Sequence, residues 1–263
     1  VGSEMGIRDR CYTDTSECRK AGTTMAQQRL DKIIASTGRY SRREVKTLVR
    51  EGRVLVDGRI AASAEDKCDP LTARISVNGE ELFYREHTYV MLHKPAGVLS
   101  ATEDGRGETV LDLLAPEYRK IGLFPVGRLD KDTEGLLLLT DDGALAHDLL
   151  APKKHVDKVY FVRTDGALDD ADCKAFEQGI TLGDGLECLP AKLEILKSDA
   201  QSEALITIRE GKFHQIKRML ASRGKPVVYL KRLSMGSLTL DEGLSKGEYR
   251  LLTAQEIAAL RGK

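Results

Sequence analysis

The sequence lacks a hydrophobic run long enough to cross a membrane. Its longest purely aliphatic stretch is Leu136 to Leu139, whereas a spanning helix needs roughly 20 apolar residues. No apolar segment of the signal-peptide type lies near the N-terminus, so we expect a cytoplasmic protein that does not contact a membrane. The five cysteines are widely spaced and form no C-x-x-C pair, which argues against a disulfide framework and against a thiolate zinc site. The 24 glycines and 7 prolines are too few for a collagen-like or low-complexity chain.

What the sequence does contain is enough apolar residues for a core and an uneven distribution of charge. Its 263 residues, 41% of them hydrophobic, allow one large domain or two smaller ones. The formal net charge is zero, yet residues 25–60 hold nine Lys/Arg against four Asp/Glu, and residues 212–232 hold seven Lys/Arg and no acid. Two such basic segments are typical of a protein that contacts a polyanion at two places, although each could also be a solvated helix face.

The N-terminal third of the chain predicts an extension followed by a small module. Residues 1–24 have neither helical nor strand periodicity, so we expect a disordered extension with Met25 as the functional start. Residues 25–84 predict two short helices and two hairpins. The hairpins are indicated by Asp57-Gly58 and Asn78-Gly79, each lying between short apolar stretches.

The second helix of this module is predicted to be basic on one face. Ser41 precedes it, with Glu44 three residues later, which is the pattern of a capping box. Arg42 and Lys46 follow each other at a four-residue spacing, with Arg43 beside them. We therefore expect these three cations on an exposed side of the helix, where they can neutralise phosphates.

From residue 85 onward strands and helices interleave without a regular βαβ rhythm. The expected strands are Tyr89–Leu92, Leu136–Thr140, Lys158–Thr164, Leu193–Leu196, Ala204–Arg209, Val227–Leu233 and Ser237–Leu240. The expected helices are Ala144–Leu150, Asp169–Gln178, His214–Ser222 and Thr253–Leu260. This order favours an α+β domain with a mostly antiparallel sheet over residues 85–263, rather than a doubly wound parallel sheet.

Acidic residues crowd a glycine-bounded loop, residues 127–143, that leads into a buried strand. Asp130, Asp132 and Asp141 fall near positions 1, 3 and 12 of an EF-hand calcium loop. The context opposes a calcium site, because a proline and a glycine just before the loop exclude an entering helix. Position 9 would be Leu138, which offers no oxygen ligand. The remaining alternative from spacing alone is a turn whose acids face solvent.

Two further segments carry unusual side chains. The helix predicted after residue 210 has Gln215, Lys217 and Arg218 near its start. A cation in that position is mildly unfavourable for the helix, so it often serves a phosphate or a carboxylate outside the helix. Tyr160 lies in a predicted strand, and on its own it would be assigned to ordinary sheet packing.

Taken together, these segments resemble the bacterial ribosomal RNA pseudouridine synthases, and most closely the RsuA-like branch that acts on small-subunit (16S) rRNA. The matching motifs are G-R-L-D-x-x-T-x-G-L-L-L-L-T-x-D-G from Gly127, H-K-P-A-G from His93, K-V-Y from Lys158, G-K-F-H-Q-I-K-R-M from Gly211 and G-E-Y-R from Gly247. His93 stands where the family usually has Asn. The module at residues 25–84 resembles the α-L RNA-binding domain seen in a ribosomal protein. The resemblance covers residues 25–260.

The resemblance implies a role for each residue of the motifs. Asp130 corresponds to the essential carboxylate that acts on a flipped-out uridine, and Lys217 to the basic residue paired with it. Tyr160 corresponds to the aromatic that stacks on the uracil, and Ile216 to the apolar residue on the other face of the base. Arg128 corresponds to the residue that helps to displace the uridine. Whether the aspartate acts as nucleophile or as base stays open.

The resemblance also implies partners. Arg218, together with Arg42, Arg43 and Lys46 of the module, is expected to contact RNA. The partner would be ribosomal RNA within a ribosomal subunit or an assembly intermediate, and the enzyme is expected to be a monomer. The reaction is an isomerisation, so no cofactor and no metal is expected. Two alternatives stay open: a large-subunit (23S) rRNA synthase, and a non-catalytic RNA-binding assembly factor.

Overall fold

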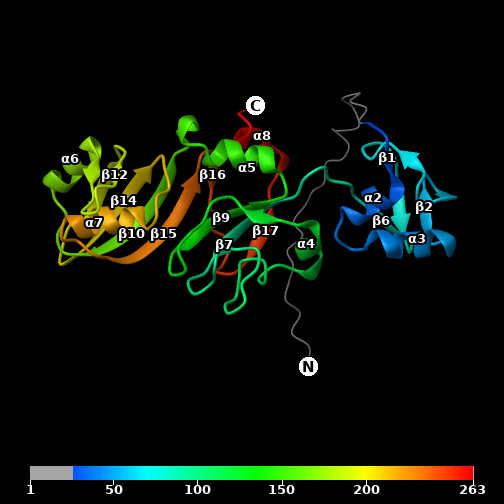
Figure 1. The fold of residues 1–263 in the computed structure, drawn as a ribbon, viewed down its shortest axis with the longest axis horizontal. Coiled ribbons are helices and arrows are strands. Elements are labelled where there is room, and N and C mark those ends of the chain that lie inside the picture. Colours follow the sequence, from blue (N-terminus) through cyan, green and yellow to red (C-terminus); the bar gives the residue numbers. More distant parts are fainter. Residues whose placement is uncertain (1–25, 263) are drawn as a thin grey trace. The chain divides into compact units, whose positions relative to one another are not determined.

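The computed structural model describes residues 26–262, and by its internal contacts the chain forms two compact units (Figure 1). Among the described residues, the first unit contains 26–88 together with 114–123, and the second contains 89–113 and 124–262. The extension expected at residues 1–24 lies outside the described residues. Within residues 26–262, no helix is long and apolar enough to cross a membrane.

The first unit packs short helices against a small antiparallel sheet. Its elements are β1 (Gln28–Arg29), α2 (Leu30–Ala35), α3 (Arg42–Arg50), β2 (Val54–Val56), β3 (Arg59–Ile60), β4 (Lys67–Cys68), β5 (Ile75–Val77), β6 (Glu80–Leu82) and α4 (Pro116–Ile121). The sheet has the order β3-β2-β5-β6, and β1 pairs with β4. Buried residues of α2 and α3, among them Ile34 and Val45, form one cluster with Val54 and Val77 of the sheet. Helices α2 and α3 therefore cover the sheet through a single small core.

Local signals determine the turns and caps of this unit. The Ser41 hydroxyl accepts a hydrogen bond from the Glu44 N–H, and the Glu44 carboxylate accepts one from the Ser41 N–H, which confirms the capping box. Asp57 and Asn78 have φ values of 51° and 56°, and each is followed by a glycine with positive φ. Positive φ at both central residues is what a two-residue type I′ hairpin turn requires, so both predicted hairpins are confirmed.

The second unit is built on one large, mostly antiparallel sheet, as expected. Its strands are β7 (Tyr89–Lys94), β8 (Phe124–Pro125), β9 (Glu134–Thr140), β10 (Lys158–Asp165), β13 (Lys192–Lys197), β14 (Gln201–Ile208), β15 (Val227–Met235), β16 (Leu238–Thr239) and β17 (Tyr249–Leu251). The main path through the sheet is β13-β14-β10-β15-β9-β7-β17, with β16 beside β15 and β8 beside β9. A separate hairpin consists of β11 (Ile180–Thr181) and β12 (Glu187–Cys188).

One pairing in this sheet is parallel, and it brings distant parts of the chain together. β15 lies alongside the start of β9, with Arg232 opposite Gly135. Gly135 has a φ of 103°, and a Cβ built there would lie 2.2 Å from the Arg232 carbonyl oxygen. Only glycine fits this close approach of two backbones. The pairing places the loop before β9 next to β15 and, through β15, next to β10.

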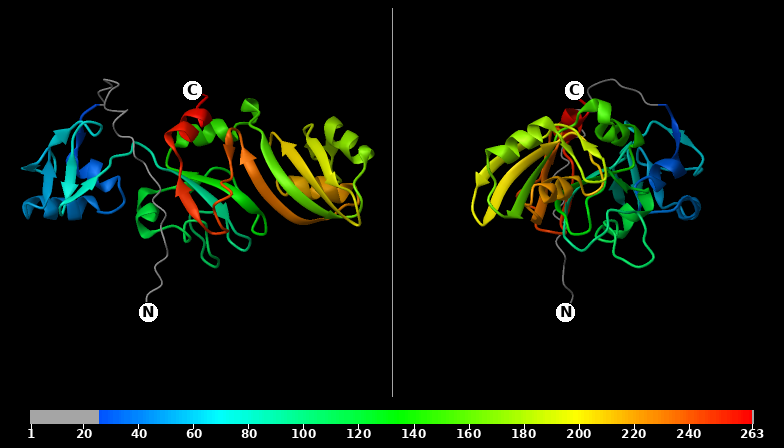
Figure 2. Two further views of the ribbon diagram at one scale, coloured as in Figure 1. Left: turned by 180° about the vertical axis from the view of Figure 1, so that it is seen from behind. Right: turned by 60° about the vertical axis from the view of Figure 1, so that its left-hand side comes forward.

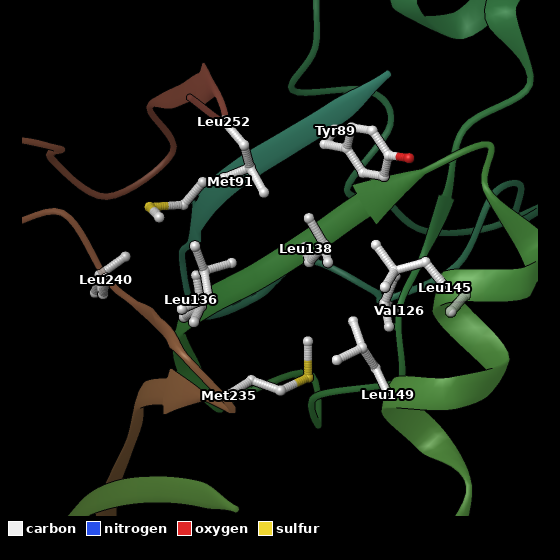
Figure 3. Packing of buried hydrophobic residues seen from close by; sticks show 12 residues of the cluster. Tyr89, Met91, Val126, Leu136, Leu138, Leu145, Leu149, Met235, Leu240 and Leu252 are labelled. Carbon is white, nitrogen blue, oxygen red and sulfur yellow. The ribbon is translucent and has the colours of Figure 1, made fainter. Parts of the chain in front are cut away.

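The helices of the second unit are α5 (Gly143–Leu150), the 3₁₀ turn η1 (Pro152–Lys154), α6 (Asp170–Gln178), α7 (Gln215–Ser222) and α8 (Ala254–Leu260). Helices α5 and α8, green and red, lie together over the β7 and β9 part of the sheet in all the ribbon views (Figures 1 and 2). Beneath them lies the main apolar cluster, in which Met91 and Leu138 of the sheet meet Leu145 and Leu149 of α5 (Figure 3). This core fixes the strand that carries the acidic loop.

The elements expected from residue 85 onward are all present, with ends that lie within three residues of the expected ones. The expected strand Ser237–Leu240 is the two-residue β16, and the capping box of Thr253 with Glu256 is formed at α8. Six elements beyond residue 85 were not expected: α4, β8, η1, β11, β12 and β17. Each is short, and none has a periodic apolar pattern long enough to be detected in the sequence.

Candidate active site

The loop before β9 begins with a tight turn that presents Asp130. The Thr133 N–H donates to the Asp130 carbonyl (3.1 Å). On one side, the Ser100 hydroxyl donates to the Leu129 carbonyl (2.9 Å) and accepts from the Leu129 N–H (3.1 Å). The backbone on both sides of Asp130 is therefore held by hydrogen bonds, which limits the movement of its carboxylate.

A buried lysine ties the other side of this turn. Lys94, at the end of β7, is 0% exposed, and its ammonium donates to the carbonyls of Pro95 (2.9 Å), Lys131 (3.2 Å) and Thr133 (2.9 Å). Burial lowers its pKa to about 8, against the stabilising effect of the nearby carboxylates of Asp132 and Asp130. Three carbonyl acceptors satisfy the three donors of an ammonium, so Lys94 stabilises the turn from inside the protein.

Asp130 faces a cation from α7. Lys217 Nζ lies 3.0 Å from Asp130 Oδ2 and 2.5 Å from Asp132 Oδ1. Burial alone would lower the pKa of Lys217, but hydrogen bonds to Asp132 and Asp130 outweigh it and raise the pKa above its usual value. The same contact lowers the pKa of Asp132. Lys217 is therefore a charged partner placed between two carboxylates, of which Asp132 is the more exposed.

The turn that leads into α7 brings a second nitrogen to Asp130. His214 has a φ of 49°, an uncommon left-handed conformation for a residue with a side chain. Its ring stacks on that of Phe213 with centroids 3.8 Å apart, and its Nε2 lies 3.5 Å from Asp130 Oδ1. Gln215 and Glu210 hold the same turn, because the Gln215 amide donates to Glu210 Oε1 (2.8 Å). The buried Glu210–Gln215 pair thus fixes the entry into the helix.

These elements enclose a pocket beside Asp130. It is lined by Arg128, Asp130, Tyr160, Ile216 and Lys217, among other residues. Tyr160 is 7% exposed and Ile216 is 4% exposed, so both are core residues that also form walls of the pocket. The structure therefore brings together five of the residues singled out in the sequence.

Arg218 has a different position. Its guanidinium lies 2.6 Å from Asp184, in the loop between β11 and β12, and it is absent from the residues that line the pocket. It follows Lys217 in the helix, so the two side chains leave α7 about 100° apart. Lys217 therefore lines the pocket, whereas Arg218 contacts the adjacent hairpin of β11 and β12.

The basic side chains of the first unit are placed as expected. Arg42, Arg43 and Lys46 are exposed on α3, whereas Val45, Leu48 and Val49 of the same helix are buried. Lys46 is the most constrained of the three, because its ammonium lies 3.6 Å from the Glu65 carboxylate. Exposed ion pairs of this kind contribute little to stability, so the three cations stay available to phosphates.

Comparison with known proteins places this geometry in a family. Residues 88–222 match the family described as RNA pseudouridylate synthase, and residues 28–70 match the S4 domain. An RNA pseudouridine synthase of Bacillus subtilis (strain 168) is 50% identical over 88% of this chain and 98% of its own. The chain belongs to the RNA pseudouridylate synthase family.

Other relatives support and refine this assignment. The ribosomal small subunit pseudouridine synthase A of Vibrio cholerae is 40% identical over 88% of this chain and 99% of its own. The ribosomal large subunit pseudouridine synthase B of Bacillus subtilis is 38% identical over 89% of this chain and 96% of its own. A crystal structure of a pseudouridylate synthase superposes with a TM-score of 0.62 at 38% identity, covering 88% of this chain and 99% of that one. The protein is thus an RsuA-like pseudouridine synthase, an isomerase with an RNA-binding S4 domain.

Sequence reasoning missed three side chains at the pocket of this synthase or next to it. Lys94 and His214 lie within the family motifs. Their spacing does not show that Lys94 donates hydrogen bonds to the loop or that His214 lies next to Asp130. Thr133 was likewise only a motif letter, yet it lines the pocket. The positive φ of His214 and the burial of Lys94 are signals that only the folded chain reveals.

The calcium alternative has no support in the geometry. Among residues 26–262, no group of three or more His, Cys, Asp or Glu side chains is arranged to hold a metal ion. Asp132 is paired with Lys217, and Leu138 is fully buried within β9. The loop of the synthase presents its carboxylates to a lysine instead.

Proposed function

We propose that this synthase converts a specific uridine of ribosomal RNA, in the small subunit, to pseudouridine, and that Asp130 is its catalytic carboxylate. The observation that carries the proposal is the pairing of Asp130 with Lys217 at 3.0 Å inside a pocket walled by Tyr160 and Ile216. The relatives named for the small subunit add to it.

The pocket suits a base that has left its stack. Unstacking a nucleotide costs a few kcal/mol, which contacts with aromatic and apolar walls offset. Tyr160 on one face and Ile216 on the other would hold the uracil ring, and Arg128 at the rim would take the place of the displaced nucleotide. The glycosidic bond would then lie next to Asp130.

The reaction needs no net addition or loss of atoms. The bond between N1 and C1′ breaks, the uracil turns, C5 bonds to C1′, and the proton leaves C5 while N1 gains one. A carboxylate in a pocket closed by a base loses hydration, which disfavours its charge. Lys217 would place a positive charge in direct contact with the Asp130 carboxylate, whether that carboxylate acts as nucleophile or as base.

RNA contacts outside the pocket would supply affinity. We assign phosphate binding to Arg42, Arg43 and Lys46 on α3, and a contact beside the pocket to Arg218. In this scheme residues 25–84 form the RNA-binding domain, residues 85–263 form the catalytic domain, and residues 1–24 form an extension. The synthase would act as a cytoplasmic monomer on ribosomal RNA within a subunit or an assembly intermediate.

Mapping of pseudouridines in ribosomal RNA from a deletion strain tests this function. We expect one small-subunit position to lose its modification and to regain it with the wild-type gene but not with Asp130→Asn. Loss of a large-subunit position instead would support the alternative favoured by the relative named for that subunit. Restoration by Asp130→Asn would refute the catalytic assignment and favour a non-catalytic assembly factor.

A further inference from the structure

The pocket of the synthase contains a buried hydroxyl that no group of the protein satisfies. Thr133 lines the same pocket as Asp130 and Tyr160, and it is 1% exposed. Its Oγ1 has no hydrogen-bond partner. A buried hydroxyl without a partner is costly, so in a substrate pocket such a group points to a partner that arrives with the substrate.

The position of this hydroxyl is fixed by the same contacts that hold Asp130. The Thr133 N–H donates to the Asp130 carbonyl (3.1 Å), and the Thr133 carbonyl accepts from the Lys94 ammonium (2.9 Å). Because both backbone groups are bound, the backbone that carries this side chain is held in one position. A β-branched side chain is also stiff about χ1. The hydroxyl is therefore held in place before the substrate binds.

We propose that the Thr133 hydroxyl donates a hydrogen bond to an oxygen of the flipped uridine. The proposal rests on the proposed role of the pocket beside Asp130 as the uridine site. Three oxygens of a uridine offer the same acceptor chemistry: O2 and O4 of the uracil and O2′ of the ribose. The contact positions the nucleotide against Asp130, so Thr133 is a substrate-binding residue that the motif letter alone does not reveal.

A second buried threonine provides a matched control. Thr164, on β10, is 0% exposed, and its Oγ1 also has no hydrogen-bond partner. It does not line the pocket. The comparison between Thr133 and Thr164 therefore separates the effect of removing a buried hydroxyl from the effect of removing one beside the substrate.

The experiment compares Thr133→Val, Thr133→Ser and Thr164→Val in single-turnover pseudouridine formation on an RNA that carries the target uridine. Valine keeps the shape of threonine without the hydroxyl. We expect Thr133→Val to slow turnover about 10-fold or more, because the substrate oxygen loses its donor. Thr133→Ser should stay nearer to the wild-type rate, and Thr164→Val should equal the wild type. The Tm of Thr133→Val should not fall, because the free protein loses no hydrogen bond.

Two results would overturn the proposal: a wild-type rate for Thr133→Val, or equal losses for Thr133→Val and Thr133→Ser. RNAs that carry 2-thiouridine, 4-thiouridine or 2′-deoxyuridine at the target identify the oxygen. On one of them the penalty of Thr133→Val should disappear, and an unchanged penalty on all three would also overturn the proposal. If the wild-type synthase forms no pseudouridine in ribosomal RNA, it is the proposed function that fails. If the wild type is active and Thr133→Val is equally active, only the proposed role of the Thr133 hydroxyl fails.

Discussion

Replacing Lys217 with methionine tests how much the synthase depends on the cation beside Asp130. The two charged groups are 3.0 Å apart, and at this separation two unit charges attract by about 1.4 kcal/mol in water and about 5 kcal/mol at an effective dielectric constant of 20. Both side chains are about three-quarters buried, so the net effect should lie between these limits. A hydrogen bond between charged groups contributes about 1.5–3 kcal/mol, which corresponds to roughly a 10- to 100-fold loss of rate.

The assay is single-turnover pseudouridine formation across pH. We expect Lys217→Met to be slower than the wild type at every pH, because the variant lacks the cation that lies 3.0 Å from Asp130. Lys217→Arg should retain more activity than Lys217→Met, since it keeps the charge but changes the geometry. Asp130→Asn should show no detectable turnover while RNA binding stays within a few-fold of the wild type.

Asp132 offers a matched control, because it contacts the same ammonium at 2.5 Å from an exposed position. We expect Asp132→Asn to keep turnover within a few-fold of the wild type, as its carboxylate lies outside the pocket lining. Equal rates for Lys217→Met and the wild type at every pH would refute the reasoning, and would leave Lys217 as a phosphate contact only. Near wild-type turnover by Asp130→Asn would refute the catalytic assignment itself.

Three further predictions concern binding and stability. Changing Arg42, Arg43 and Lys46 to alanine should weaken RNA binding and reduce its log-log salt slope by roughly 0.7–0.9 per lost phosphate contact, as measured by binding titrations at several salt concentrations; an unchanged slope would remove these residues from the interface. Burial lowers the pKa of Lys94 to about 8 from 10.5, so between these pH values the unfolded chain binds more protons than the folded one. The stability of the wild type relative to Lys94→Met should therefore rise with pH in this range. If the difference in free energy of unfolding, measured by denaturant titration, does not change with pH, the prediction is wrong. Ser41→Ala removes the cap of α3 and should cost about 1 kcal/mol, which faster amide exchange in α3 would reveal.

The sequence predicted the features that depend on neighbouring residues. The capping box at Ser41, the turn at Asn78 and the helix that carries Lys217 all follow from patterns that span a few residues. Tyr160 shows the limit of such patterns. Its position in a predicted strand indicated a residue packed in the sheet, and only the family motif indicated a contact with the substrate. The structure shows Tyr160 to be buried and to line the pocket, and its contact with the substrate stays a prediction.

The features that could not be predicted depend on residues far apart in the chain. The three hydrogen bonds of Lys94 reach up to 39 positions away, and the ion pair of Lys217 with Asp132 spans 85. Lysine is almost never fully buried unless its charge is matched by partners, so composition alone would place Lys94 at the surface. Likewise, no local pattern shows that Thr133 is buried or that its hydroxyl lacks a partner.

The order of strands in the large sheet has a consequence for how the protein matures. β7 and β9 pair with each other, and their outer neighbours on the main path of the sheet, β17 and β15, come much later in the chain. Pairings between such distant segments are slow to form, because a long loop must be closed first. During synthesis β7 and β9 therefore emerge before β15 and β17, and only the short β8 is available to pair along the outer edge of β9. The pocket takes its lining from residues between Arg128 and Leu230, so it can form only after β15 has been synthesised and has paired with β9.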